Sequence, residues 1–105
     1  MYFITALANV KSIDELEDDK DACVSFSSAC FGYYENFNVA DTEVRNNTCD
    51  INETINDYVV IEEIKQGIHP HAEEKQWYKF DYDNYIYQPC DKPESIKMFC
   101  NFALG

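Results

Sequence analysis

The sequence predicts an α+β domain, in which one main helix packs on a mainly antiparallel β-sheet and a short helix lies near the C-terminus. Residues 2–10, 57–64 and 75–82 are rich in β-branched and aromatic side chains, which favours strands. No strand–helix–strand unit repeats along the chain, so a parallel sheet is not expected. The 105 residues have the length of a single domain, and we treat residues 1–105 as one unit.

The first strand is expected at residues 2–10, which are apolar on both faces and therefore suited to the interior of a sheet. Ser12 and Glu15 form a capping-box pattern, which predicts a short helical turn. Acidic residues then crowd together, and we interpret residues 11–29 as an acidic, mobile insertion or connection.

A second strand and the main helix are expected next. Residues 30–34 (Cys-Phe-Gly-Tyr-Tyr) are typical of a strand. Asn38 is the expected N-cap of the helix, with Asp41 near the positive end of the helix dipole. Residues 49–56 fit either a turn of helix or an irregular link.

A hairpin is expected in the second half of the chain. Residues 57–64 predict a strand by their β-branched content, and residues 75–82 alternate so that one face is strongly aromatic. Asp83 and Asn84 suit a two-residue turn, because both residue types tolerate positive φ. Residues 85–87 then form the returning strand.

The C-terminal end is expected to hold a short helix and a final strand. Pro89 is expected to end the preceding strand. Asp91 and Glu94 resemble a capping box at the start of the helix. Residues 101–104 are interpreted as a last strand, which completes the predicted order β-β-α-β-β-β-α-β.

Acidic residues dominate the charge of the chain. There are 20 of them against 8 basic residues, a net charge of −12, beyond the magnitude of about 2–8 usual for a small domain. Direct nucleic-acid binding is not expected, because phosphate contacts need Lys and Arg. An anionic membrane surface is disfavoured for the same reason, and no run approaches the roughly 20 apolar residues of a membrane span. A basic protein partner fits this charge, although acidity alone also provides solubility.

The five cysteines leave one thiol unpaired in any monomeric disulfide scheme. The apolar N-terminal run is too short for a secretory signal and lacks its basic segment. We therefore expect a cytoplasmic protein with reduced, mostly buried thiols. The cysteine spacings match no zinc-finger or redox motif.

His69 and His71, which are followed by two glutamates, form the cluster closest to a metal site. A Zn²⁺ site needs three or four ligands converging on one point, and Pro70 favours an extended geometry that points the two imidazoles apart. A polar turn explains the same residues better, so we expect no metal and no cofactor. The chain also lacks a nucleophile elbow and a phosphate-binding loop, which favours a protein that is not an enzyme.

The predicted hairpin tip is the strongest candidate for a binding site. Asp81, Tyr82, Asp83 and Tyr85 lie together there. Tyrosine gives contact area at low entropic cost, and carboxylates beside it would pair with Arg or Lys of a basic partner. Part of the aromatic run is also expected in the core. The acidic segment offers a second set of candidate partner-binding residues, Glu17, Asp18 and Asp19.

The chain resembles a family of small, uncharacterised acidic proteins of phages and prophages of low-GC Gram-positive bacteria. The matching pieces cover most of the chain except residues 11–29. They are Tyr2-Phe3-Ile4-Thr5-Ala6, Cys30-Phe31-Gly32-Tyr33-Tyr34, Val44-Arg45-Asn46-Asn47, Asp50-Ile51-Asn52-Glu53, Tyr58-Val59-Val60-Ile61-Glu62-Glu63, Gly67-Ile68-His69-Pro70, Trp77-Tyr78-Lys79-Phe80, Cys90-Asp91-Lys92-Pro93-Glu94 and Asn101-Phe102-Ala103-Leu104-Gly105. The resemblance implies a phage accessory protein that acts on host machinery.

Our leading hypothesis is a non-enzymatic phage or prophage accessory protein in the bacterial cytoplasm. It would bind and inhibit a basic host factor, such as a defence nuclease or sensor, through its acidic and aromatic surface. The alternative is a small-ligand binder that sequesters a nucleotide signal by Tyr or Trp stacking, with Arg45, Lys79 and Lys92 as its cations. A metal-dependent enzyme at His69 and His71 is a third, less favoured hypothesis.

Overall fold

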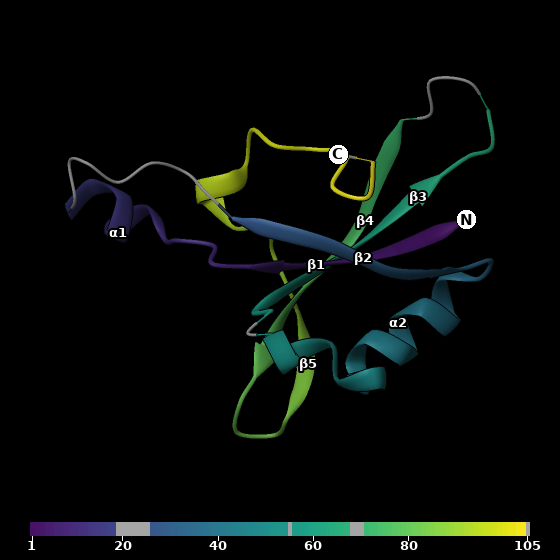
Figure 1. The fold of residues 1–105 in the computed structure, drawn as a ribbon, viewed down its shortest axis with the longest axis horizontal. Helices are drawn as coiled ribbons and strands as arrows, with labels where there is room; N and C mark the ends of the chain where they lie inside the picture. The colour runs from purple at the N-terminus through teal and green to yellow at the C-terminus, as the bar shows by residue number, and fades with distance from the viewer. Residues whose placement is uncertain (19–25, 55, 68–70, 105) are drawn as a thin grey trace.

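The computed structural model describes residues 1–18, 26–54, 56–67 and 71–104. Five strands form one antiparallel sheet with a helix packed on it, which confirms the predicted α+β class (Figure 1). Along the chain, the elements are β1 (Tyr2–Ala8), α1 (Ile13–Asp18), β2 (Ser27–Tyr34), α2 (Phe37–Arg45), the 3₁₀ segment η1 (Thr48–Thr54), β3 (Tyr58–Ile64), β4 (Ala72–Asp81), β5 (Ile86–Cys90) and the 3₁₀ turn η2 (Glu94–Ile96).

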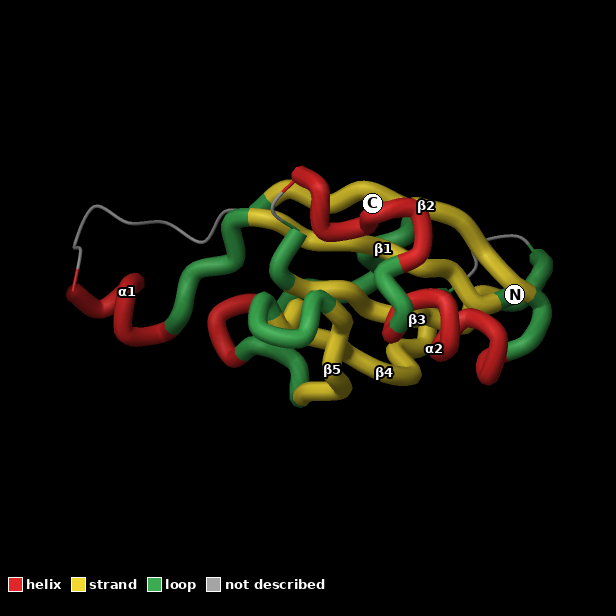
Figure 2. The backbone as a smooth tube through the Cα atoms, turned by 90° about the horizontal axis from the view of Figure 1, so that it is seen from below, coloured by secondary structure: helices red, strands yellow, loops and turns green. Residues whose placement is uncertain are grey.

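The strand order of the sheet is β2-β1-β3-β4-β5. The interior place predicted for the first strand is therefore confirmed: Ile4 of β1 pairs with Gly32 of β2 on one side and with Ile61 of β3 on the other. β2 and β5 form the two margins of the sheet, which lie far apart in Figure 2.

α2 and η1 cover one face of the sheet and lie below β1 and β2 in Figure 1. Because side chains alternate along a strand, every second residue of β1 and β3 reaches this layer. The buried core here consists of Ile4, Ala6, Ala40, Val44, Ile51, Val59, Ile61, Tyr78, Phe80 and Tyr87.

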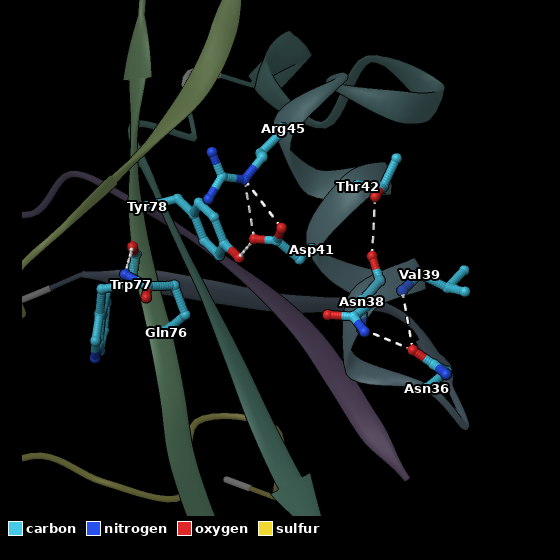
Figure 3. Close-up of polar contacts among 9 residues, drawn as sticks. All are labelled: Asn36, Asn38, Val39, Asp41, Thr42, Arg45, Gln76, Trp77 and Tyr78. Carbon is cyan, nitrogen blue, oxygen red and sulfur yellow. Dashed lines mark hydrogen bonds and ion pairs between the residues drawn. The ribbon is translucent and has the colours of Figure 1, made fainter.

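A polar contact fixes α2 against β4 within this layer. The hydroxyl of Tyr78 donates to the carboxylate of Asp41, and Arg45 Nε donates to both oxygens of the same carboxylate at 3.0 Å (Figure 3). Burial, followed by the bond to Asp41, raises the pKa of Tyr78 well above its ordinary value. The tyrosine therefore stays neutral and keeps its role as a donor.

The C-terminal segment covers the other face of the sheet and lies above β1 and β2 in Figure 1. Its buried core consists of Leu7, Val60, Trp77, Ile96 and Phe102. The Trp77 and Phe102 rings meet edge to face at 5.3 Å. Lys92 Nζ lies 5.4 Å from the centre of the Phe102 ring and donates to Glu74 Oε2 at 2.9 Å.

A buried carboxylate holds this C-terminal segment in place. Glu62 is fully buried, and its oxygens accept the backbone N–H groups of Phe102 at 3.0 Å and Ala103 at 2.9 Å. Asn101 Oδ1 accepts the N–H of Ala72, the first residue of β4, at 2.9 Å. Residues 101–104 therefore form a turn tied down by side chains, and the predicted last strand there is wrong.

Two further predictions about helix starts are corrected. Asn36, not Asn38, is the N-cap of α2, and its Oδ1 accepts the N–H groups of Asn38 at 2.8 Å and Val39 at 3.4 Å (Figure 3). The short C-terminal helix is η2, and Pro93 is its N-cap with no side-chain cap bond, so the predicted capping box of Asp91 and Glu94 does not form.

The segment at 11–29 is only partly a connection. The predicted helical turn forms as α1, and Ser12 caps it, since Ser12 Oγ accepts the N–H of Glu15 at 3.2 Å. β2 starts at Ser27, three residues before the predicted strand. Pro89 also lies within β5 rather than at its end, because an edge strand tolerates a residue without an N–H.

Candidate binding surface at the hairpin tip

The loop that joins β4 to β5 contains four residues, 82–85, rather than the predicted two-residue turn. Asp81 builds this loop. Its Oδ1 accepts the N–H groups of Asp83 at 3.0 Å and Asn84 at 3.3 Å, and its Oδ2 accepts Asn84 Nδ2 at 2.8 Å. These bonds, led by the one from the Asn84 side chain, lower the pKa of Asp81. The carboxylate of Asp81 is therefore used to stabilise the turn rather than left free for a partner.

Aromatic rings gather around Phe80 at the same end of the hairpin. Phe80 is buried and meets Tyr82, Tyr85 and Tyr87 edge to face, with ring centres 4.8, 5.1 and 4.9 Å apart. Tyr82 and Tyr85 remain 61% and 59% exposed. Tyr87 is fully buried and its hydroxyl donates to the backbone oxygen of Asn56 at 2.6 Å. The sequence predicted Tyr82 and Tyr85 at the binding surface and part of the aromatic run in the core. The structure exposes these two rings and buries Phe80, and it also buries Tyr87, which the sequence did not assign to the core.

Asp57 is a residue of this site that the sequence did not single out. The Tyr82 hydroxyl donates to its Oδ1 at 2.5 Å, and this bond raises the pKa of Tyr82 to about 12. Asp57 directly precedes β3, and the antiparallel pairing of Tyr58 with Lys79 brings it beside the end of β4. The pairing of the two predicted strands was the signal that could have found it.

We call Asp57, Tyr82, Asp83 and Tyr85 the hairpin-tip surface. Asp83 is exposed, and no hydrogen bond or ion pair of its carboxylate is found among the described residues. Two tyrosine rings held by a buried phenylalanine thus lie beside carboxylates. Such rings give contact area without losing much side-chain freedom, and the carboxylates can accept charge-assisted bonds from Arg or Lys.

The acidic segment is placed only in part. Glu17 is exposed on α1 and Asp18 is the last residue of that helix, whereas Asp19 lies outside the described residues. Another acidic residue of α1, Glu15, lines the same hollow as Asp57. Glu15 of α1 and Asp57 of the hairpin-tip surface therefore border one hollow.

The histidine turn is described only at its end. His71 is exposed, and His69 lies outside the described residues. Within the described ranges, no group of three or more His, Cys, Asp or Glu side chains is placed to hold a metal ion.

The predicted burial of the cysteines is wrong for the four that the structure describes. Cys30, Cys49 and Cys100 are exposed, and Cys90 is half-buried. All four are free thiols, and Cys23 lies outside the described residues. Burial raises the pKa of Cys90, so this thiol is held in its unreactive form.

The three cations proposed for a nucleotide do not form one cluster. Arg45 is paired with Asp41 on α2, whereas Lys92 donates to Glu74 and to the Phe99 oxygen on the other face. Lys79 Nζ lies 5.9 Å from the centre of the Tyr58 ring. Trp77 is also unsuited to stacking, because only 5% of it is exposed.

Comparisons with protein-family models, with curated proteins and with solved structures found no match to this chain. Among the described residues, no helix has the length and apolar character needed to cross a membrane.

Proposed function

We propose that this chain is a non-enzymatic binding protein that docks on a basic protein partner through the hairpin-tip surface. The observation that carries the proposal is the pair of half-exposed tyrosines, Tyr82 and Tyr85, held in place by Phe80 beside the carboxylates of Asp57 and Asp83. The net charge of −12 supports a basic partner, because opposite charges steer association.

The resemblance to phage and prophage proteins supplies the biological setting of the proposal. In that setting the chain is an accessory protein in the bacterial cytoplasm that inhibits a host factor, such as a defence nuclease or sensor. Such factors contact phosphate groups through basic surfaces, and an acidic protein with aromatic anchors can occupy a surface of that kind.

The test is an affinity capture from a low-GC Gram-positive bacterium with wild-type and variant proteins side by side. Asp83→Lys and Tyr85→Ala change the hairpin-tip surface without touching the carboxylate that builds the turn. Asp91→Lys is the matched charge control, since Asp91 is exposed at the other end of β5. We expect a protein that wild type and Asp91→Lys retain and that Asp83→Lys and Tyr85→Ala lose.

Salt provides the second arm of the test. At about 1 M salt the Debye length shrinks to about 3 Å, so capture through charge pairs should weaken strongly. A partner that Asp83→Lys retains at wild-type level, or whose capture does not respond to salt, would contradict docking by acidic residues.

A polar hollow favours a small-ligand binder as the second candidate function. The hollow has a volume of about 460 Å³ and is lined by Lys79, Tyr58 and Ser95, among others. This volume lies within the range of about 300–1,000 Å³ typical of ligand pockets, and the Ser95 hydroxyl is buried without a hydrogen-bond partner in the described structure. A nucleotide that binds here should raise the melting temperature by mass action, and Lys79→Ala should abolish that shift.

A further inference from the structure

β2 is an edge strand with few of the features that normally protect an edge. It contains eight residues, none charged and none proline, and each is exposed or half-buried. The opposite edge, β5, is shorter, with five residues, and carries Pro89. Proteins usually block an edge by lysine, by proline or by short length, so the two margins differ in how open they are to another strand.

Within the described parts of the chain, the backbone of β2 is hydrogen-bonded to a neighbouring strand on one side only. Its register pairs it with β1, and no backbone hydrogen bond links β2 to any other described segment. Alternate N–H and C=O groups of an edge strand point away from the sheet. An extended chain can hydrogen-bond to these groups and so add a strand to the sheet.

A bulge gives the edge a side-chain anchor. Thr5 pairs with Cys30 and Ile4 with Gly32, so Phe31 is left over between them. Gly32 has a φ of 147°, which a residue with a side chain rarely adopts. The Phe31 ring remains 48% exposed and lines a hollow between β2 and η1.

The size and lining of this hollow suit one apolar side chain. Its volume is about 200 Å³, below the roughly 300–1,000 Å³ of pockets that hold a whole small ligand. Ile4, Phe31 and Ile51 supply apolar walls. A Val, Leu or Ile side chain from an added strand would bury these apolar side chains.

The charge around the hollow is negative. Glu43 lines it and accepts the Thr48 hydroxyl at 2.5 Å, while the described residues that line it include no Lys or Arg. Glu35 directly follows β2, and Asp50 is exposed in η1 beside Cys49, another lining residue. An added segment therefore meets a neutral backbone edge flanked by carboxylates.

We propose that the outer edge of β2 accepts an extended, basic segment of a protein as an additional antiparallel strand, with an apolar side chain of that segment in the hollow beside Phe31. Main-chain hydrogen bonds supply the affinity in this mode of recognition, and the pocket supplies the specificity. A second copy of the chain is a poorer occupant, because each molecule carries a net charge of −12 and two copies therefore repel each other.

This inference does not depend on the hairpin-tip surface. β2 and β5 are opposite margins of the sheet, and the β4–β5 hairpin belongs to the margin away from β2 (Figure 2). The two surfaces can therefore be tested separately, and either can fail alone.

The test uses three synthetic peptides with the eight-residue length of β2. The first alternates Lys and Val, the second alternates Glu and Val, and the third is the Lys–Val peptide with N-methyl groups on alternate residues. Fluorescence polarisation measures their binding to the intact protein. We expect the Lys–Val peptide to bind, the Glu–Val peptide to show no binding, and N-methylation to weaken binding at least about tenfold, which corresponds to about 1.4 kcal/mol.

Protein variants locate the site. Phe31→Lys should weaken the Lys–Val peptide about tenfold or more, since it removes the anchor wall and adds a like charge. Met98→Lys is the matched control, because it makes the same charge change at an exposed apolar residue that belongs neither to β2 nor to the hairpin-tip surface. It should leave peptide binding unchanged. Ser28 lies on the same edge, outside the bulge. Ser28→Lys replaces Phe31→Lys if circular dichroism shows that Phe31→Lys is poorly folded.

Four results would overturn the proposal. The first two are no binding of the Lys–Val peptide and equal binding after N-methylation. The third is an equal loss of binding in Met98→Lys and in the β2 variant, which is Phe31→Lys or its replacement Ser28→Lys. The fourth is a concentration-dependent dimer in light scattering that the β2 variant dissolves. The last result would assign the edge to a second copy of this chain. A failure of the hairpin variants in affinity capture leaves these peptide results unaffected, so the two proposals stay distinguishable.

Discussion

The Glu62 carboxylate accepts the backbone N–H of Ala103 at 2.9 Å, across 41 positions of the chain. The same carboxylate accepts the N–H of Phe102 at 3.0 Å. A buried charge is costly unless it is hydrogen-bonded, and here the C-terminal turn supplies the donors. The turn and the sheet therefore depend on each other.

Glu62→Gln should lower the free energy of unfolding by about 1–3 kcal/mol. An amide keeps one acceptor oxygen, so one of the two backbone N–H groups loses its partner, and the new NH₂ group is buried without an acceptor. Urea unfolding followed by circular dichroism measures the change. Glu53→Gln is the control, because Glu53 is exposed, and it should stay within about 0.5 kcal/mol of wild type. Equal stabilities of the two variants would show that Glu62 does not anchor the C-terminal turn.

The pH dependence of stability should carry the signature of Glu62. Burial raises its pKa, with Glu74 acting in the same direction, while the bonds from Ala103 and Phe102 and the charge of Lys92 oppose it. The folded protein therefore keeps a proton at pH values where the unfolded chain, with a glutamate pKa of about 4.3, has lost it. The stabilising contribution of this proton is complete below about pH 4.3 and is lost as the pH rises through the folded-state pKa.

We expect the unfolding free energy of Glu53→Gln to follow the wild-type fall over this pH window. Glu62→Gln should show a shallower fall, because the group that titrates is gone. Urea unfolding at a series of pH values measures both slopes. Identical slopes for the two variants would show that Glu62 titrates at its ordinary pKa.

Tyr78→Phe should loosen α2 from the sheet. The variant loses the bond from the Tyr78 hydroxyl to Asp41, whereas Arg45 still pairs with that carboxylate. A hydrogen bond to a charged group contributes about 1.5–3 kcal/mol, and we expect a loss near the lower end because Asp41 keeps one partner. Thermal unfolding measures it, and Tyr33→Phe, at an exposed tyrosine of β2, should cost much less.

Asp57→Asn should return Tyr82 toward the ordinary tyrosine pKa of about 10. The bond to the Asp57 carboxylate is the largest cause of the raised pKa of about 12. NMR titration of the Tyr82 ring follows the change directly. Asp83→Asn is the matched control and should leave the value near 12, since the Tyr82 hydroxyl bonds to Asp57. An unchanged pKa in Asp57→Asn would mean that the hydroxyl bond does not persist in solution.

The strands of the sheet interior could be predicted from the sequence because their signal is local. β1, β3 and β4 carry β-branched and aromatic residues over seven residues or more. The N-cap of α2 could not be fixed in this way. Asn36 and Asn38 are both suitable caps, and the choice depends on where β2 ends at Tyr34.

The C-terminal turn could not be predicted because its hydrogen bonds are not local. Residues 101–104 have strand-like composition, but the N–H groups of Phe102 and Ala103 bond to Glu62 rather than to a neighbouring strand. At the candidate site, the exposed tyrosines could be found from the sequence. The structural role of Asp81 and the presence of Asp57 could not, since both depend on the loop geometry and on the β3–β4 pairing.

The interior position of β1 also bears on how fast the protein folds. Tyr2 pairs with Tyr34 on one side and with Glu63 on the other, so both neighbours of the first strand come from distant parts of the chain. Two-state domains dominated by such non-local pairing fold in about milliseconds to seconds, far more slowly than helical bundles. Until β3 pairs with β1, the apolar faces of both strands stay exposed to other molecules. A slower pairing step therefore gives the unfinished sheet more time to aggregate.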